Sequence, residues 1–452
     1  MEVLPFVHEG LGNSSYLVDI GNGRAAAIDP NRRVDAYLRG LSDRGLTLAA
    51  IFETHLHADF ISGARELAAE TGAPFFASAA GGIKYAHNGL QGGQSVQLDG
   101  CQITAIASPG HTPEHLAYVL RTAASEPLLF SGGSLIVGGA ARSDLIAPDQ
   151  TEALTRAQYR TLRTAFSHLP DDTVLLPTHG GGSFCSTGAG SDRVSTLGRE
   201  RRENPALSIE DEEEFVRWFP LTFPGAPDFF FKLRPINQAG PRLRRDVPRP
   251  RPLSPAEFDA ARRGALVVDA RQKEDYSPRH IPASLSVPFR DSFGVWLGWT
   301  VDIETPLLFV LDGAPLDAVV DESLLVGFER FAGYLEGGIE AWERAGLPLA
   351  AEGLIDAREA RRRLSDGALA LDVREPSEWE AGRIPGAKHV PLGRLKQEVQ
   401  RLPAGRPVVV YCGHGERAST AVSMLEAAGL EDLANLDGGI EAWRAAGFAL
   451  EP

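Results

Sequence analysis

Cysteine is scarce in this chain, which has 3 cysteines in 452 residues. So few cysteines cannot form a disulfide framework, and because their spacing matches no metal-ligand motif, each must be interpreted from its own surroundings. Long apolar runs are also missing, since no stretch reaches the roughly 18 residues that a membrane-spanning helix needs. The first residues lack the basic and apolar regions of a secretory signal. The sequence therefore predicts a cytoplasmic protein with no membrane partner.

An excess of basic residues is missing as well. The formal net charge is -15, whereas a nucleic-acid-binding surface needs clustered Lys and Arg. We therefore expect no nucleic-acid partner. With 43% hydrophobic and 23% charged residues, the composition is that of a globular protein. At about 100–200 residues per domain, the length predicts about three domains.

The most informative motif is a short cluster of metal-binding side chains. His55 and His57 are two positions apart and Asp59 follows two positions later, so two imidazoles and a carboxylate share one turn. This is a ligand set for Zn or Fe. The apolar segment 49–54 predicts a buried strand before the turn, and segment 62–70 predicts a helix after it. The cluster therefore lies in a strand-to-helix loop, where chemistry is commonly placed.

Two further histidines follow apolar segments in the same way. His111 stands between Gly110 and Thr112, and His179 follows the apolar segment 175–177. Each lies among turn residues directly after an expected strand. Three such positions in order predict one site that is assembled from several strand ends.

With these motifs in place, the chain from Met1 to the low 230s resembles the metallo-β-lactamase superfamily, which implies an αββα sandwich. The likeness is carried by residues 54–63 and 110–113, and the expected hairpin of strands 16–20 and 25–29 fits it. Within the superfamily, the segment is most similar to persulfide dioxygenases. That resemblance implies one Fe(II) ion and the oxidation of a thiol persulfide by O2.

The chain departs from the superfamily pattern at two positions. Phe60 stands where the turn has a further His, and Gly133 stands where the family has a metal-binding Asp. The resemblance then leaves a three-histidine set for one Fe(II) or Zn ion, and a site that binds no metal stays open. Replacing Gly133 by Asp is expected to tighten metal binding. The interpreted ligands are His55, His57 and His111.

Three other residues are assigned around that ligand set. We expect Asp59 to orient a ligand histidine and His179 to line the pocket. Asp144 is the nearest carboxylate downstream, and it is interpreted as either a partner of a ligand or a loop cap.

Cys412 is the cysteine whose surroundings indicate chemistry. It follows the apolar strand 408–411 and precedes a helix expected over 418–428, so its sulfur faces backbone N–H groups at a helix N-terminus. Such a position favours the thiolate and stabilises an anionic persulfide, and Arg417 adds a positive charge. Cys101 is interpreted as structural, whereas Cys185, six residues after His179, is interpreted as a residue near the metal without a catalytic role. The remaining members of the expected persulfide loop are Gly413, His414, Gly415 and Glu416.

The stretch around Cys412 resembles the rhodanese sulfurtransferases, and it occurs twice. Motifs at 269–271 and 337–342 return at 372–374 and 438–443, at offsets of 103 and 101 residues. A unit of about 100 residues indicates a domain duplication, because solenoid repeats have periods of roughly 20–50 residues. The first copy has Asp312 where the second has Cys412, so we expect it to carry no sulfur and to have a structural or docking role.

The predicted organisation is α/β throughout. An αββα metallo-β-lactamase-like sandwich covers 1–239, an inactive rhodanese-like domain with a parallel sheet covers 253–350, and an active one covers 354–452. The Pro- and Arg-rich segment 240–252 is expected to be an exposed, semi-rigid linker.

The functional hypothesis is a sulfur-metabolism enzyme. It would oxidise a low-molecular-weight thiol persulfide at one metal ion and transfer sulfane sulfur through Cys412, with sulfite or thiosulfate as partners. Two alternatives stay open, a mononuclear zinc thioester hydrolase fused to a sulfurtransferase and a metal-free scaffold that presents substrate to Cys412. The sequence leaves open the carrier thiol and the identity of the metal. It also leaves open the oligomeric state, and a homo-oligomer is one of the possibilities.

Overall fold

The computed structural model describes residues 2–122, 125–186, 192–403 and 405–452. The chain forms two compact units. One is Met1–Asp246 with Leu324–Gly327, and the other is Val247–Ser323 with Phe328–Pro452. Within the described ranges, no helix is long and apolar enough to cross a membrane.

The first unit contains two six-stranded sheets, with strand orders β1-β2-β3-β4-β5-β6 and β12-β11-β10-β9-β8-β7. The strands of the first sheet are β1 (Val3–His8), β2 (Asn13–Gly21), β3 (Arg24–Ile28), β4 (Thr47–Phe52), β5 (Phe75–Ser78) and β6 (Asn88–Leu90). Those of the second are β7 (Ser95–Leu98), β8 (Cys101–Ala107), β9 (Leu116–Thr122), β10 (Ser125–Gly132), β11 (Val174–Pro177) and β12 (Ser195–Thr196). The helices are α1 (Val34–Ser42), α2 (Ala64–Thr71), α3 (Thr151–Thr164), α4 (Leu197–Glu203), α5 (Pro205–Ser208), α6 (Glu212–Trp218) and α7 (Phe230–Ala239).

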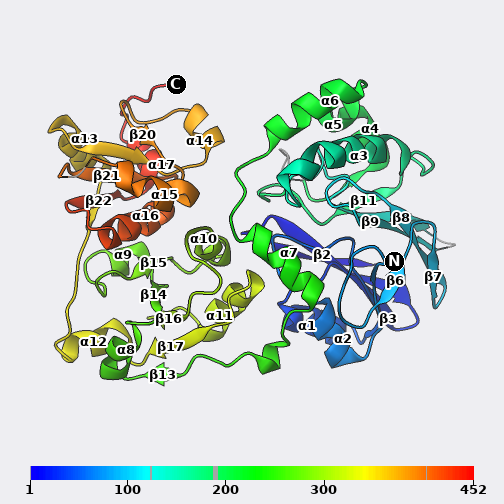
Figure 1. The fold of residues 1–452 in the computed structure, drawn as a ribbon, viewed down its shortest axis with the longest axis horizontal. Helices are drawn as coiled ribbons and strands as arrows, with labels where there is room; N and C mark the ends of the chain where they lie inside the picture. The colour runs from blue at the N-terminus through cyan, green and yellow to red at the C-terminus, as the bar shows by residue number, and fades with distance from the viewer. Residues whose placement is uncertain (1, 123–124, 187–191, 404) are drawn as a thin grey trace. The chain divides into compact units, whose positions relative to one another are not determined.

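Three hydrophobic clusters, which lie between successive layers of helices and sheets, hold this unit together. The middle cluster lies between the sheets and joins side chains such as Tyr16 and Val18 to Tyr118 and Phe130. An outer cluster packs α1 and α2 against the first sheet, and another packs α3 to α6 against the second. Figure 1 shows these helices on the outer faces of the two sheets. The layers are α, β, β and α, so the predicted sandwich is confirmed.

The expected local elements around the first histidine cluster are present. The predicted strand 49–54 is β4, shifted by two residues, and the predicted helix 62–70 is α2. Helix α2 ends at Gly72, whose φ of 73° is the left-handed conformation that glycine adopts at helix ends. The predicted hairpin is the antiparallel pair β2 and β3. The loop between β4 and α2 therefore carries the first cluster, as the sequence indicated.

The second unit contains two five-stranded sheets with equivalent orders, β13-β17-β16-β14-β15 and β18-β22-β21-β19-β20. All strand pairs in both sheets are parallel. The first sheet has β13 (Pro252–Leu253), β14 (Leu266–Asp269), β15 (Leu285–Ser286), β16 (Leu307–Val310) and β17 (Phe331–Leu335). The second has β18 (Gly353–Ile355), β19 (Leu369–Asp372), β20 (Lys388–His389), β21 (Val408–Tyr411) and β22 (Leu433–Leu436).

Helices cover these parallel sheets, as parallel sheets require. In the second copy, α15 and α16 pack on one face, while α13 and α17 pack on the other. The repeated strand order agrees with the duplication inferred from the sequence. The helices are α8 (Pro255–Ala261), α9 (Lys273–Tyr276), α10 (Phe293–Thr300), α11 (Leu316–Leu325), α12 (Gly338–Arg344), α13 (Ala357–Ser365), α14 (Pro376–Glu380), α15 (Leu395–Glu398), α16 (Glu416–Ala427) and α17 (Gly439–Ala445).

The segment 240–252, expected to be an exposed, semi-rigid linker, is only partly exposed. Arg65 donates from Nη1 to the carbonyl oxygen of Pro241 at 2.6 Å, and the backbone N–H of Arg244 donates to the Glu66 carboxylate at 2.8 Å. Arg249 and Arg251, further along, are exposed. The first part of the segment is thus hydrogen-bonded to the first unit.

Candidate functional site

Three strand ends of the first unit bring three buried imidazoles together. His55 follows β4, His111 follows β8 and His179 follows β11. One ligand atom from each lies within 4.8 Å of the others, and the Nε2 atoms of His55 and His179 are 3.3 Å apart. The ring centroids are 4.8 to 5.3 Å from one another. Side chains up to 124 positions apart in sequence therefore form one cluster.

A neighbour holds the Nδ1 atom of each of these rings. The distances are 2.8 Å from His55 Nδ1 to Thr54 Oγ1, 2.6 Å from His111 Nδ1 to the Arg142 carbonyl oxygen, and 3.2 Å from His179 Nδ1 to Asn13 Oδ1. Because a carbonyl oxygen only accepts, the Nδ1 of His111 donates and its Nε2 carries the free lone pair. Anchoring one ring nitrogen in this way orients the other, as in metal-ligating histidines.

His57 is placed differently from the other two members of its predicted set. Its Nε2 lies 3.4 Å from Asp29 Oδ1, and its ring stacks on Phe60 with the centroids 4.2 Å apart. Neither ring nitrogen has a hydrogen-bond partner among the described residues. Two further groupings of possible ligand atoms include it, one with Asp29 and His55 and one with Asp59 and His179.

Asp59 lies beside His179, where we expected a carboxylate that orients a ligand. Its Oδ2 accepts from Asn13 Nδ2 at 2.6 Å and lies 3.4 Å from His179 Nδ1. Burial alone would raise the pKa of Asp59, but the charges of His179 and His57 outweigh burial and hold this pKa below its usual value. The carboxylate is therefore ionised at neutral pH.

Asp144 reaches the cluster only through a neighbour. It forms a two-point ion pair with Arg142, at 2.6 Å and 2.8 Å, and the carbonyl oxygen of Arg142 is the group that holds His111. The side chain of Asp144 thus fixes the residue that positions a candidate ligand.

Burial favours the neutral form that metal binding requires in two of the candidate ligands. Desolvation is the largest cause that lowers the pKa of His55 and of His111 well below the usual value, and neighbouring histidines add to it. Burial also lowers the pKa of His115 to about 3. Neutral imidazoles offer their lone pairs. The trio of His55, His111 and His179 therefore fits a single Zn or Fe(II) ion with positions left for substrate.

Gly133 is closed to any side chain. A Cβ atom there would lie 2.5 Å from His111 Cδ2 and 3.0 Å from Ala141 Cβ. Its backbone N–H donates to His115 Nε2 at 3.0 Å. The His111 ring occupies the space that a new side chain needs, so the structure argues against the expectation that an Asp at this position tightens metal binding.

The second candidate site surrounds Cys412, which follows β21 and is buried. The backbone N–H of Gly415 donates to Cys412 Sγ at 3.1 Å. Gly415 has a φ of 110°, a conformation that favours glycine. The predicted helix after the loop is α16, which starts at Glu416. The loop therefore turns a backbone N–H toward the sulfur, as the sequence indicated.

Arg417 is fixed beside the sulfur by an acidic partner. Its Nη1 and Nη2 lie 2.6 Å and 2.7 Å from the two Glu378 carboxylate oxygens. Burial lowers the pKa of Arg417, but Glu378 and the Cys412 thiol raise it by more, so this pKa lies above its usual value. His414, in the same loop, is exposed.

Three side chains of the cysteine-free copy reach the Cys412 loop, and sequence reasoning missed them. Trp296 packs on the core that contains Cys412, with its ring 5.6 Å from the Arg417 guanidinium carbon. Arg290 pairs with Glu416 at 3.3 Å. Lys273 packs against Gly415, since a Cβ atom added to Gly415 would lie only 2.9 Å from the Cε atom of Lys273. No local motif marks these residues, since they approach through packing between the copies.

Asp312, which we expected at the cysteine position of the first copy, lies one residue past it. Val310 and Tyr411 pair with the equivalent residues Asp269 and Asp372, so Leu311 corresponds to Cys412. Asp312 Oδ2 accepts from the backbone N–H of Ile339, at the start of α12, at 2.9 Å. In the second copy, the backbone oxygen of Cys412 accepts from the equivalent N–H of Ile440 at 2.8 Å. The Asp312 side chain in the first copy thus accepts the hydrogen bond that the Cys412 backbone oxygen accepts in the second copy.

The two remaining cysteines are buried. Burial is the largest cause that raises the pKa of Cys101 and the pKa of Cys185. A raised thiol pKa opposes nucleophilic chemistry. This environment agrees with a structural role for Cys101 and with the absence of a catalytic role for Cys185, whose pKa is also raised by Asp59 of the candidate metal site.

Profile comparisons match all three parts of the chain. The Metallo-beta-lactamase superfamily matches residues 8–188, and the Rhodanese-like domain matches residues 254–345 and 356–446.

Individual relatives and solved structures agree with these matches. A hydroxyacylglutathione hydrolase of Pseudomonas entomophila is 34% identical over 237 residues, which are 48% of this chain and 91% of the relative. The thiosulfate sulfurtransferase GlpE of Ectopseudomonas mendocina is 32% identical over 91 residues, 20% of this chain and 84% of the relative. The crystal structure of a metallo-beta-lactamase from Staphylococcus aureus subsp. aureus COL has a TM-score of 0.65 and 28% identity, and covers 74% of this chain and 98% of its own.

Proposed function

Because this chain belongs to the metallo-beta-lactamase superfamily and to the rhodanese-like family, we propose that it is a sulfur-metabolism enzyme with two chemical sites. The first unit would oxidise a low-molecular-weight thiol persulfide at one metal ion. The second unit would transfer sulfane sulfur through Cys412. Sulfite or thiosulfate would be the sulfur acceptor or donor.

The convergence of His55, His111 and His179 is the observation that supports the metal site. The geometry favours His179 over His57 as the third ligand, because the Nε2 of His57 faces Asp29. An Fe(II) ion held by this trio would supply oxidation of the persulfide sulfur by O2. Within the protein, Asp59 and Asn13 would hold the ring of His179 in place.

The sulfur-transfer step needs only groups around Cys412. The Sγ thiolate attacks the outer sulfur of thiosulfate, the S–S bond of thiosulfate breaks, and sulfite leaves with the bonding electron pair. The N–H of Gly415, 3.1 Å from Sγ, would stabilise the negative charge before and after transfer. Arg417 would hold the anionic donor beside it. The reverse step gives the sulfur to sulfite and forms thiosulfate.

A zinc-dependent thioester hydrolase is the second candidate for the first unit. The similarity to a hydroxyacylglutathione hydrolase over 48% of this chain favours it, and so does a donor set made only of nitrogens, which suits zinc. Zinc would supply a water nucleophile at neutral pH. The departures at Phe60 and Gly133 keep the metal-free scaffold as a third candidate.

Metal analysis of protein purified without oxygen tests these candidates. We expect one iron per chain, lost in His55→Ala, together with oxygen uptake on glutathione persulfide. One zinc with hydrolysis of a hydroxyacylglutathione thioester would establish the second candidate. Less than about a tenth of an equivalent of any metal, with the same low content in His55→Ala, would refute both and leave the scaffold.

A further inference from the structure

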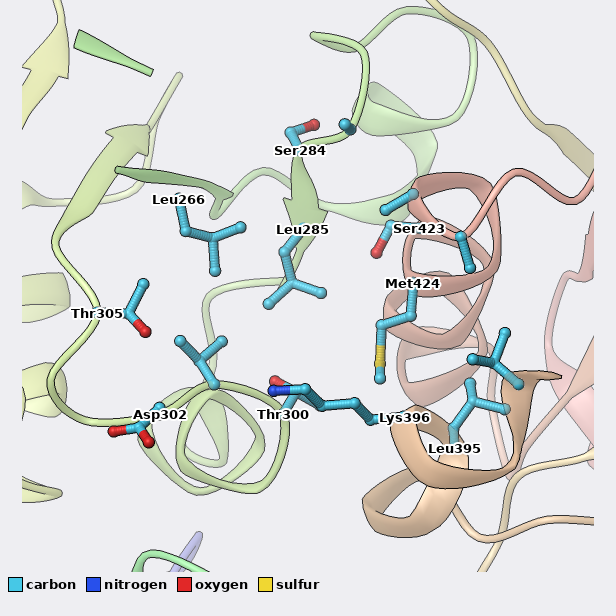
Figure 2. A pocket seen from close by; sticks show the side chains of 15 residues that line it. Leu266, Ser284, Leu285, Thr300, Asp302, Thr305, Leu395, Lys396, Ser423 and Met424 are labelled. Carbon is cyan, nitrogen blue, oxygen red and sulfur yellow. The ribbon is translucent and has the colours of Figure 1, made fainter. Parts of the chain in front are cut away.

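A cavity of about 370 Å³ lies between the two rhodanese-like copies, inside the second unit. We call it the seam cavity. Figure 2 shows Leu266 and Leu285 of the first copy on one side and Met424 and Leu395 of the second copy on the other. None of the Cys412 loop residues line it. The seam cavity is therefore separate from the candidate sulfur-transfer site.

Specific hydrogen bonds join the copies beside the cavity. The hydroxyls of Ser286 and Ser419 are 2.8 Å apart, and the backbone N–H of Ser286 donates to Ser423 Oγ at 3.0 Å. The Nε2 of His280 lies 2.8 Å from the carboxylate of Glu426. These contacts hold the two walls at a defined separation, as a preformed binding site requires.

Two hydroxyls in the cavity walls already donate to backbone carbonyl groups of the protein. The hydroxyl of Ser423 donates to the Thr420 carbonyl oxygen at 2.8 Å, and that of Thr300 donates to the Trp296 carbonyl oxygen at 2.7 Å. These hydroxyl protons are therefore not free for a ligand. The interior accordingly offers apolar contacts from leucine, valine, methionine and alanine side chains.

One cation stands at the edge of this apolar space. Figure 2 shows the side chain of Lys396 extending from the second copy toward the first across the cavity. Across the described part of the chain, Lys396 takes part in no ion pair. Asp302, the other charged lining residue, accepts from the backbone N–H of Glu304 at 3.0 Å. This bond orients the Asp302 carboxylate without neutralising it, so Lys396 is the one cation among the lining residues that can pair with an anionic ligand.

We propose that the seam cavity binds an amphipathic monocarboxylate. The carboxylate pairs with Nζ of Lys396, and an alkyl or aryl body lies against Leu266, Leu285 and Met424. At roughly 30 Å³ per water-sized group, the cavity holds about a dozen non-hydrogen atoms. Carboxylates with about eight to ten carbons fill it.

The methionine content of the chain makes the test direct. The chain has 2 methionines, Met1 and Met424, and Met424 lines the seam cavity. In protein labelled with 13C in the methionine methyl groups, one NMR signal, that of Met424, therefore reports on the cavity. Met424→Leu identifies this signal, because the signal disappears in that variant. We expect octanoate to shift the Met424 signal to saturation and to leave the Met1 signal in place. Octan-1-ol, which lacks the charge, should bind several-fold more weakly.

Exposed positions supply the variants, so folding is not at risk. Lys396→Glu should weaken octanoate binding by about fivefold or more, the scale of a surface ion pair, and Lys84→Glu in the first unit is the charge-matched control. Ala427→Trp should abolish binding by filling the cavity, with thermal unfolding by circular dichroism as the folding check. An unmoved Met424 signal would overturn the proposal. Equal binding of octanol, or binding that survives Ala427→Trp, would overturn it equally.

Discussion

Gly133→Asp restores the residue that the superfamily carries, and we expect it to weaken metal binding. A Cβ atom at this position would lie 2.5 Å from His111 Cδ2, whereas carbon atoms prefer separations of about 3.5–4.0 Å. The ring must therefore move by roughly 1 Å, which exceeds the ~0.2 Å tolerance of a metal–ligand distance. Gly133→Ala, which adds only the Cβ, should already show most of the loss.

The size of the loss follows from the role of the ring. Disturbing the residues that orient a ligand costs about 10–100-fold in metal affinity, so displacing one of three ligands should cost at least that. Overpacking should also reduce the free energy of unfolding by about 1–3 kcal/mol. Metal content after dialysis against a graded chelator measures the affinity, and urea unfolding measures the stability.

A glycine without neighbours provides the control. A Cβ built on Gly264 meets no atom within 4 Å, so Gly264→Ala should keep wild-type metal content. If Gly133→Asp bound metal more tightly than the wild type while remaining folded, the steric argument would be refuted. The new carboxylate would then be a ligand, and the His111 ring would have another position.

Three further substitutions test the assignment of roles. Cys412→Ser should abolish thiosulfate-to-cyanide sulfur transfer, because a serine hydroxyl forms no persulfide, yet keep oxygen uptake on a pre-formed persulfide; loss of that uptake at normal metal content would contradict two independent sites. His179→Ala should weaken the affinity for the metal at least tenfold more than His57→Ala does. If metal analysis gave the opposite ranking, His57 would be the third ligand in place of His179. Glu378→Gln should slow sulfur transfer by about tenfold and raise KM for thiosulfate, because the guanidinium beside the sulfur loses its two-point partner. An unchanged KM would show that the Arg417–Glu378 ion pair does not position the donor. Because this ion pair is partly exposed, its loss should lower the free energy of unfolding by about 1 kcal/mol or less.

The sequence predicted most of what depends on local pattern. The strand before His55 and the helix after it appear within two residues of their expected bounds. The turn into α16 after Cys412 appears as well. Such elements follow from apolar periodicity and from glycine at helix ends, which are properties of a few consecutive residues.

Sequence reasoning could not predict which side chains of distant segments lie together. His57 is two residues from His55, and sequence proximity placed it in the ligand set; the structure adds Asp29 beside its Nε2 and keeps His57 in two groupings of possible ligand atoms. Gly133 was interpreted as a missing carboxylate, although its lack of a side chain makes room for His111. Neither contact has a local signature, because both partners lie more than twenty positions away.

By itself, the sequence determined the αββα sandwich, the duplicated rhodanese-like copies and the cysteine that one copy lacks. Only the tertiary structure decided which imidazoles converge, that Trp296 and Lys273 of the inactive copy reach the Cys412 loop, and that an apolar cavity with a lysine at its edge lies between the copies. The physical reason is the range of the interactions. Hydrophobic periodicity acts over one helix or strand, whereas a site made by packing depends on pairs such as His55 and His179, 124 positions apart.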